Sequence, residues 1–234
     1  MNNPFDFFNK VFCINLKERE DRWKESVSNF RKYSIKNYER IGAVKIKDDT
    51  LNSKRRGQIG CSLSYACTIN KALKENAEKI LILEDDFDFI FGKEKLYKKI
   101  NSAINDLPKD WDCLYFGGTT VEEYGHKPLE KYSNNLLKLK CAHTTHSIAF
   151  SRTGMLKILA LLKHSEEKPW HETIVKDYVC IDSFLAKDYQ KNTNSFITSD
   201  ILCVQRPSFS DIENTNYDYK SWMINNFAKF KKEL

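Results

Sequence analysis

Three adjacent carboxylates mark the most informative stretch of the sequence, ILILEDDFDFIF at residues 80–91. Four apolar residues, typical of a buried strand, run directly into Glu84, Asp85 and Asp86, and apolar residues then follow again. Alternation along a strand predicts that Glu84 and Asp86 point to one side and Asp85 to the other. Two converging carboxylates repel each other, and a hard divalent cation such as Mg²⁺ or Mn²⁺ relieves that repulsion. The stretch is therefore a candidate metal–phosphate site, and the alternative is a solvated acidic turn.

Asp182 and Asp211 are the candidates for a catalytic base. Asp182 lies in the apolar stretch VCIDSFL, where a carboxylate is either catalytic or buried beside a backbone or arginine partner. Asp211, in SFSDI, is either a second candidate base or a residue that caps a turn. His143 and His146 are three residues apart and face opposite sides of an expected strand, so at most one can complete a metal site. The alternative for either histidine is a polar side chain at a strand end.

Strands and helices that alternate through the first half of the chain must position these side chains. The expected strands are VFCINL at 11–16, YERIGAV at 38–44, EKILILEDD at 78–86 and WDCLYFGG at 111–118, and the expected helices span 18–33, 58–76 and 93–107. In the first helix, Trp23, Val27 and Phe30 recur at helical spacing. Residues 45–57 are polar and aperiodic and are expected to form a loop. The alternation predicts a mostly parallel sheet with helices on both faces.

The second half of the chain is more mixed. Its pattern predicts strands at 136–142, 146–151 and within 194–205, and helices at 153–163 and 177–189. Because no repeat, low-complexity linker or break in the pattern divides the chain, we predict a single α/β domain over residues 1–234, with 214–234 as a C-terminal tail. Ligands of such sheets bind beyond the carboxyl ends of the strands, which is where residues 84–86 stand.

Composition narrows the function. The 234 residues are 41% hydrophobic and 30% charged, as in an ordinary globular protein, and no apolar run approaches the roughly 20 residues of a membrane span. The N-terminus has no pattern of a secretory signal, so we expect a cytoplasmic protein, at most peripherally associated with a membrane. Seven scattered cysteines without a C-x-x-C pair exclude a zinc ribbon or thioredoxin-type site. The net charge of +6 suits a phosphorylated donor, while no nucleic-acid-binding signature is present.

Three segments together resemble glycosyltransferase family 25, the lipooligosaccharide-biosynthesis and procollagen-galactosyltransferase group. They are FCINLKEREDRW, GQIGCSLSYACTINKAL and KILILEDDFDF, in this order and at this spacing. THSIAFSRTGMLKIL, DYVCIDSFL and QRPSFSDI are similar to later segments of the family, so the resemblance covers nearly the whole chain. Tyr65 departs from the pattern, because it stands where the family usually has histidine.

The resemblance implies a GT-A fold with a Rossmann-like sheet, a UDP-sugar donor, a divalent metal (Mn²⁺ or Mg²⁺) and inversion at the anomeric carbon. Under it Asp86, helped by Glu84 or Asp85, would hold the cation and offset the charge of the departing diphosphate. Asp182 and Asp211 remain the candidate bases for the acceptor hydroxyl. The implied donor-binding residues are Asn15, Leu16, Arg19, Arg22, Gln58, Gly60, Ser64 and Asp85, of which Gln58, Gly60 and Ser64 are expected at a helix start that offers backbone N–H groups.

The sequence therefore predicts a metal-dependent, inverting glycosyltransferase that moves a hexose, galactose by the resemblance, from a UDP-sugar to a glycan or a hydroxylated protein. Tyr65 favours one alternative, a non-catalytic relative that binds a glycan or another partner. A glycoside hydrolase with two catalytic carboxylates is a further alternative, but it leaves the arginine-rich segment after the first strand unexplained. A setting at the inner face of a membrane, or in a virus, is compatible with the sequence.

Overall fold

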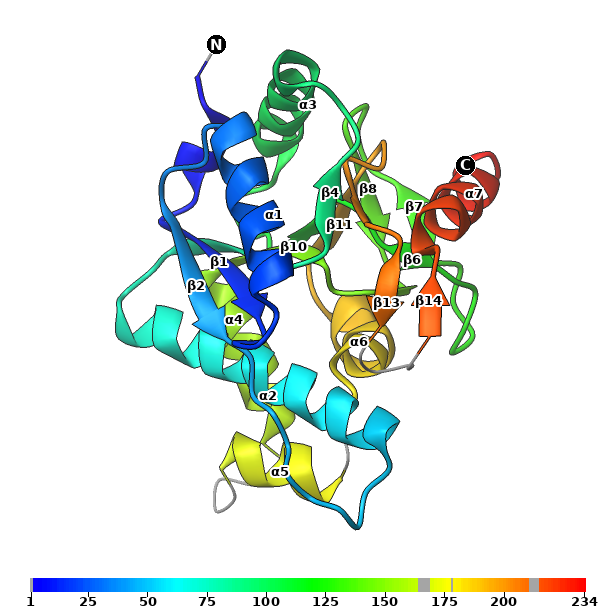
Figure 1. Ribbon diagram of the computed structural model, residues 1–234. Helices are drawn as coiled ribbons and strands as arrows, with labels where there is room; N and C mark the ends of the chain where they lie inside the picture. The colour runs from blue at the N-terminus through cyan, green and yellow to red at the C-terminus, as the bar shows by residue number, and fades with distance from the viewer. Residues whose placement is uncertain (1, 164–168, 178, 211–214) are drawn as a thin grey trace.

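An eight-stranded sheet with the strand order β2-β1-β3-β10-β5-β11-β8-β7 organises the structure, a computed structural model that describes residues 2–163, 169–177, 179–210 and 215–234 (Figure 1). Its strands are β1 (Lys10–Asn15), β2 (Tyr38–Gly42), β3 (Lys79–Glu84), β5 (Cys113–Tyr115), β7 (Leu129–Lys131), β8 (Leu136–Leu139), β10 (Ser147–Ser151) and β11 (Ser195–Thr198). All of them run in one direction except β8 and β10. The prediction of a mostly parallel sheet is confirmed.

Helices cover both faces of this sheet. They are α1 (Glu20–Lys32), α2 (Ser53–Lys74), α3 (Lys93–Asp106), α4 (Arg152–Leu162), α5 (Trp170–Lys176), α6 (Ile181–Phe184) and α7 (Tyr219–Lys231). Three short strand pairs lie outside the sheet: β4 (Phe87–Phe89) with β12 (Cys203–Gln205), β6 (Thr119–Thr120) with β9 (Ala142–His143), and β13 (Ser208–Ser210) with β14 (Thr215–Tyr217). No helix in the described residues has both the length and the apolar composition of a membrane span.

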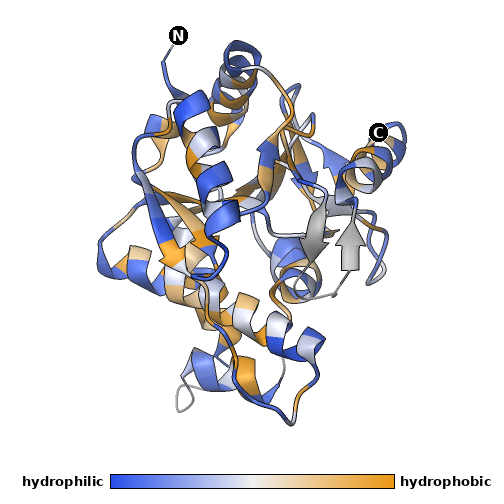
Figure 2. Cartoon of the chain, in the orientation of Figure 1, coloured by the Kyte–Doolittle hydropathy of each residue, from blue (hydrophilic) through white to orange (hydrophobic). Residues whose placement is uncertain are grey.

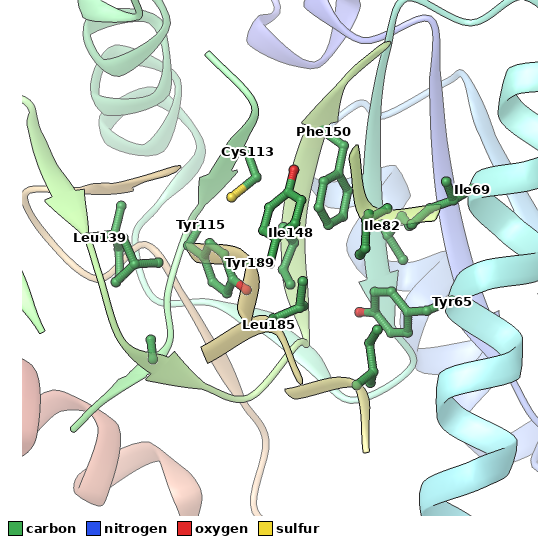
Figure 3. Close-up of a cluster of buried hydrophobic side chains, with 14 of the residues drawn as sticks. Tyr65, Ile69, Ile82, Cys113, Tyr115, Leu139, Ile148, Phe150, Leu185 and Tyr189 are labelled. Carbon is green, nitrogen blue, oxygen red and sulfur yellow. The ribbon is translucent and has the colours of Figure 1, made fainter. Parts of the chain in front are cut away.

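Alternation along the strands divides the core between the two faces. In β3, Ile80 and Ile82 belong to one hydrophobic cluster, together with side chains of α2 and α4. Leu81 and Leu83 belong to the other, together with side chains of α1 and α3. Figure 3 shows part of the first cluster, with Tyr65 of α2 beside Ile82. Blue, hydrophilic residues alternate with lighter ones along α1 and α3, as expected for helices with one buried face (Figure 2).

The start of α2 differs from the prediction. The helix begins at Ser53, five residues before the expected start, because the side chain of Asn52 caps it by accepting a hydrogen bond from the Arg55 backbone N–H at 2.9 Å. Residues 53–57, expected in a loop, are therefore helical. Gln58 and Gly60 lie within the helix and not at its exposed N-terminus.

The C-terminal segment is more than a tail. Asp218 caps α7, and three apolar side chains of this helix, Met223, Phe227 and Phe230, are buried in the core cluster of the α2 face. The hydrophobic packing of these three residues holds α7 against the rest of the fold. The prediction of a single domain over the whole chain stays a prediction.

Candidate functional site

A pocket of about 610 Å³ lies beyond the carboxyl ends of β1 and β3, at the edge where the sheet pattern predicts a ligand. One wall comes from the end of β1, the loop after β2 and the first turns of α2. The rest of the lining comes from the loop that leads into β10, from α6 and from the start of α7. The acidic residues 84–86 line the pocket too. Figure 1 shows β1 and β2 on the left of the view and α7 on the right, with α2 running across the view below α6.

Strand alternation sends the first two acids to opposite faces, as predicted. Glu84 continues the α2 face and accepts hydrogen bonds from the Thr145 hydroxyl at 2.6 Å and the Tyr65 hydroxyl at 3.3 Å. Asp85 continues the α1 face and accepts hydrogen bonds from Asn15 Nδ2 at 2.6 Å and from an Arg22 guanidinium nitrogen at 2.9 Å. Asp85 thus connects α1 to β1 through these hydrogen bonds. It has a structural role and also places a negative charge at the pocket.

Strand β12 fixes the backbone of the acidic turn from the other end of the chain. The Arg206 backbone N–H donates to the Asp86 carbonyl at 2.8 Å, and its guanidinium donates to the Asp85 carbonyl at 2.7 Å. The same guanidinium lies 2.8 Å from a Glu25 carboxylate oxygen on α1. Arg206 falls in the QRPSFSDI segment, but only tertiary contact brings it beside the acidic turn about 120 positions earlier, so no local pattern assigns it to this site.

Burial and mutual repulsion perturb the acids. Burial, and secondly the charge of Asp86, raise the pKa of Glu84 from 4.5 to about 8. Burial, and secondly the charge of Asp85, raise the pKa of Asp86 from 3.8 to about 6, against the opposing effect of Arg22 and Arg206. The Asp86 side chain is 15% exposed, and its Oδ1 has no hydrogen-bond partner among the described residues. The neighbouring groups therefore do not fully neutralise the negative charge of Glu84 and Asp86, and a cation would stabilise both carboxylates.

Tyr65, the departure from the family pattern, is part of this acidic centre. Its ring is fully buried, and its hydroxyl contacts both the Thr145 carbonyl and Glu84. A phenol has one proton, so at any moment the Tyr65 hydroxyl donates either to the Thr145 carbonyl or to Glu84 Oε1.

The carboxylates of Glu84 and Asp86 fit a cation of the Mg²⁺ or Mn²⁺ type. Within the described ranges no group of three or more His, Cys, Asp or Glu side chains is arranged to hold a metal. Such a cation is commonly held by one or two carboxylates and takes its other ligands from water and substrate phosphates. The buried oxygen of Asp86 without a partner is the observation that favours a bound cation at this place.

The histidines do not extend the acidic centre. His146 is fully buried, its Nε2 lies 3.1 Å from the Cys203 carbonyl, and burial lowers its pKa to about 4. It is not among the described residues that line the pocket, and a histidine as a further metal ligand stays a prediction. His143 does line the pocket. Its Nε2 lies 3.1 Å from Glu123 Oε2 and its Nδ1 3.9 Å from Asp182 Oδ2, so both ring nitrogens face carboxylates other than Glu84 and Asp86.

The structure brings most of the predicted donor residues to the pocket. Those that line it are Asn15, Leu16, Arg22, Gln58, Gly60, Ser64 and Asp85. Arg19 is not among the described lining residues, and its guanidinium pairs with Asp21 at 3.0 Å on the surface. Lys45, Arg56, Thr145 and Gln205 also line the pocket, and no local pattern distinguishes these residues within their segments.

Gly60 and Ser64 shape the pocket wall. They lie within α2 and not at the helix start expected for them, and their role in donor binding stays a prediction. A Cβ atom at Gly60 would lie 2.4 Å from the Val44 carbonyl oxygen, so only glycine lets α2 approach the loop after β2 this closely. The Ser64 hydroxyl accepts from the Val44 N–H at 2.8 Å and donates to the Gly60 carbonyl at 2.6 Å. Together they hold Val44 in the wall.

Of the two candidate bases, Asp182 reaches the pocket. It lies in the first turn of α6, and its Oδ1 accepts a hydrogen bond from the Ser183 backbone N–H at 2.7 Å. Its Oδ2 is the oxygen near His143. The side chain is 33% exposed, which leaves it accessible to a substrate hydroxyl. Asp211 lies outside the described residues.

Comparisons with known proteins find the same family that the sequence motifs resemble. The family model described as glycosyltransferase family 25 (LPS biosynthesis protein) matches residues 8–165. Procollagen galactosyltransferase 2 of Homo sapiens is 24% identical over 204 residues, which are 79% of this chain and 31% of the relative. A glycosyltransferase 25 family member of Aedes aegypti is 26% identical over 194 residues, 73% of this chain and 30% of the relative. The chain thus spans about a third of the length of these relatives.

Among solved structures, a glycosyltransferase involved in glycosylation of the major capsid of PBCV-1 aligns with 88% of this chain and 95% of its own. It shares 11% identity at a TM-score of 0.39, which is too low to bear on function. The mostly parallel sheet flanked by helices agrees with the GT-A-type fold that was predicted. Because the family model matches more than half of its residues, the chain belongs to glycosyltransferase family 25.

Proposed function

We propose that the protein transfers a hexose, galactose in the first instance, from a UDP-sugar to a hydroxyl group of a glycan or protein, with inversion and with the help of a divalent cation. Family membership supports the transfer of a sugar, and the name of the human relative suggests galactose. The observation that carries the proposal is the pair Glu84 and Asp86, buried together in the pocket with raised pKa values and with a buried oxygen lacking a partner.

Several pocket-lining side chains near the end of β1 suit a UDP group. Arg22 lies 4.0 Å from Asp86 and brings positive charge to the place where phosphates would meet the acids. Arg56 lines the same wall, and its guanidinium donates to the carbonyls of Asp48 and Leu51, which holds it in place. Leu16 and Ile46 add apolar surface for a base or ribose.

Glu84 and Asp86 would hold the cation, which when bound supplies a Lewis acid that offsets charge on the departing diphosphate. The chain's part is to keep both carboxylates in place. Thr145 and Tyr65 orient Glu84, and the backbone contacts of Arg206 fix the turn that carries Asp86. Fixed charges of this kind need no reorganisation as the bond breaks, which is their catalytic advantage.

Asp182 would take the proton of the acceptor hydroxyl. Its Oδ1 is held by the Ser183 N–H, so Oδ2 is the oxygen available for the proton. His143 Nδ1 lies 3.9 Å from Oδ2, which is beyond hydrogen-bond distance, and its Nε2 lies 3.1 Å from Glu123 Oε2, so His143 is a close neighbour of the proposed base. A carboxylate held in this way within reach of the acceptor meets the geometric demand of general base catalysis.

Asp86→Asn tests the proposal against Asp88→Asn, a matched loss of charge two residues later. Asp88 lies on β4, paired with β12, and is not among the described pocket-lining residues. Melting temperatures are measured with UDP, with and without Mn²⁺, and transfer or hydrolysis is followed with UDP-galactose, UDP-glucose and UDP-GlcNAc. Ligand at 100 times its Kd stabilises the native state by about 2.7 kcal/mol, which a thermal shift detects readily.

The wild type and Asp88→Asn are expected to show a shift with UDP that depends on Mn²⁺, together with turnover of one sugar nucleotide. Asp86→Asn is expected to lose the Mn²⁺-dependent shift and at least about 100-fold in rate, while its melting temperature without ligand shows that it folds. Wild-type turnover by Asp86→Asn would refute the metal site. No shift of the wild type with UDP would refute the donor, and binding without turnover would favour the non-catalytic alternative.

A further inference from the structure

The wall of the pocket formed by α7 carries two aromatic side chains, Tyr219 and Trp222. Their ring centroids are 6.4 Å apart, and the planes are tilted by 47°. Trp222 is 47% exposed, although it is the largest apolar side chain of the wall. We propose that these rings form a platform for a sugar ring of the acceptor, so that the acceptor is a glycan and not a hydroxylated amino-acid side chain. This inference rests on the proposed glycosyl transfer.

Packing of α7 does not explain the exposed tryptophan. The helix is already held by Met223, Phe227 and Phe230, which are 0%, 4% and 8% exposed. Leaving half of an indole in water forgoes stabilisation that burial would provide, at about 25 cal/mol per Å² of apolar surface. Aromatic side chains that line a concave pocket are typical of ligand contact. A ligand that covers Trp222 recovers this stabilisation.

The platform stands where an acceptor must enter. In an inverting displacement the hydroxyl attacks from the side opposite the leaving group. The diphosphate is assigned to the wall of β1 and α2, with the acids beside it, so the acceptor lies toward α6 and α7. Asp182, the proposed base on α6, and Trp222 on α7 both line this pocket. Trp222 and the base therefore face one substrate.

A sugar ring matches the side chains of this part of the pocket, because it has both an apolar face and hydroxyl groups. One face of a pyranose presents C–H groups that pack on an indole, while its hydroxyls require polar partners. Gln205 at the end of β12 also lines the pocket, and its Oε1 is buried without a hydrogen-bond partner among the described residues. Rotation of this amide would let it accept a sugar hydroxyl. A flexible hydroxylated amino-acid side chain would not cover the broad aromatic surface.

Trp222→Ala tests the platform, with Trp222→Phe as the conservative variant. Ile224→Ala is the matched control, because Ile224 is 36% exposed on the same helix but is not among the described pocket-lining residues. Each protein, loaded with UDP and Mn²⁺, is applied to an array of immobilised glycans that also carries hydroxylysine peptides. The thermal shift with UDP and Mn²⁺ is measured in parallel as a readout of the donor side.

The wild type and Ile224→Ala are expected to bind at least one class of glycan and no peptide. Trp222→Ala is expected to lose at least tenfold in glycan binding, Trp222→Phe to keep most of it, and all variants to keep the UDP shift. Binding of no glycan, preference for the peptides, unchanged binding by Trp222→Ala, or equal loss of the UDP shift would each overturn the platform. The wild type could instead show no thermal shift with UDP while its glycan binding is still weakened by Trp222→Ala. That result would overturn the donor proposal alone.

Discussion

Replacing Glu84 by glutamine is expected to stabilise the protein at pH 8 when no divalent cation is present. Glutamine has nearly the same shape as glutamate and keeps an oxygen that can accept the hydrogen bond of Thr145. It removes the negative charge that lies buried beside Asp86. The gain in the free energy of unfolding should grow as the pH rises.

The sign follows from the raised pKa. Folded protein keeps the Glu84 proton up to about pH 8, whereas the unfolded chain releases it near 4.5, so stability from this group is present below pH 4.5 and is lost as the pH rises through 8. The difference of 8 − 4.5 pH units at 1.36 kcal/mol each gives a ceiling of about 5 kcal/mol. Because Glu84 titrates together with Asp86, we expect on the order of 2–4 kcal/mol.

Urea unfolding at pH 5, 6.5 and 8 in EDTA measures the effect for the wild type, Glu84→Gln and the control Glu78→Gln. Glu78 is a largely exposed partner of Arg152, so its variant should follow the wild type at every pH. The excess stability of Glu84→Gln should rise by a few kcal/mol from pH 5 to pH 8. Mn²⁺ should then stabilise the wild type at pH 8 and have little effect on Glu84→Gln.

A flat difference between the two proteins from pH 5 to pH 8 would refute the reasoning. It would show that Glu84 loses its proton at an ordinary pKa in the folded state, and hence that the carboxylates do not form a buried, repelling pair. A larger response of Glu84→Gln than of the wild type to Mn²⁺ would separately refute the assignment of the cation to this pair.

Two further variants probe the base and the pocket wall. Asp182→Asn should lower the rate of transfer by about 10²–10⁴-fold, because the proton acceptor is lost. The thermal shift with UDP should be kept, because the substitution leaves the donor-binding residues unchanged. A wild-type rate would show that Asp182 is not the base. Gly60→Ala should destabilise by about 1–3 kcal/mol in urea unfolding, because the new Cβ atom meets the Val44 carbonyl at 2.4 Å. Gly42→Ala, which has nothing within 4 Å, is its control, and equal stability of the two variants would contradict the close approach.

Local pattern was enough to predict the sheet and the acidic centre. In ILILEDD the same alternation that buries Ile82 and Leu83 on opposite faces carries on to Glu84 and Asp85, so their directions follow from the sequence. The start of α2 was missed because its signal is a single cap residue, Asn52, within a polar stretch that otherwise resembles a loop. Capping depends on one hydrogen bond and leaves no periodic trace.

The remainder of the site depends on tertiary contacts, for which the sequence holds no local sign. Arg206 contacts the acidic turn only because β12 pairs with β4, and nothing in its own segment predicts that pairing. Trp222 lies in what was expected to be a tail, and its neighbours Met223 and Phe227 fix its position by packing. His146 was selected for its type, yet its burial beside Cys203 follows from the placement of β10.

The central position of β10 has a consequence for biosynthesis. This strand lies between β3 and β5, so one edge of β3 stays unpaired until β10 has been synthesised. β3 ends at residue 84 and β10 ends at residue 151, which is 67 residues later. At about 5–20 residues per second a ribosome needs roughly 3–13 s to make that segment. During this interval the nascent chain presents an unpaired, hydrophobic strand edge, which is a site for aggregation. Yield in a cell should therefore depend on translation speed and on chaperones that shield β3.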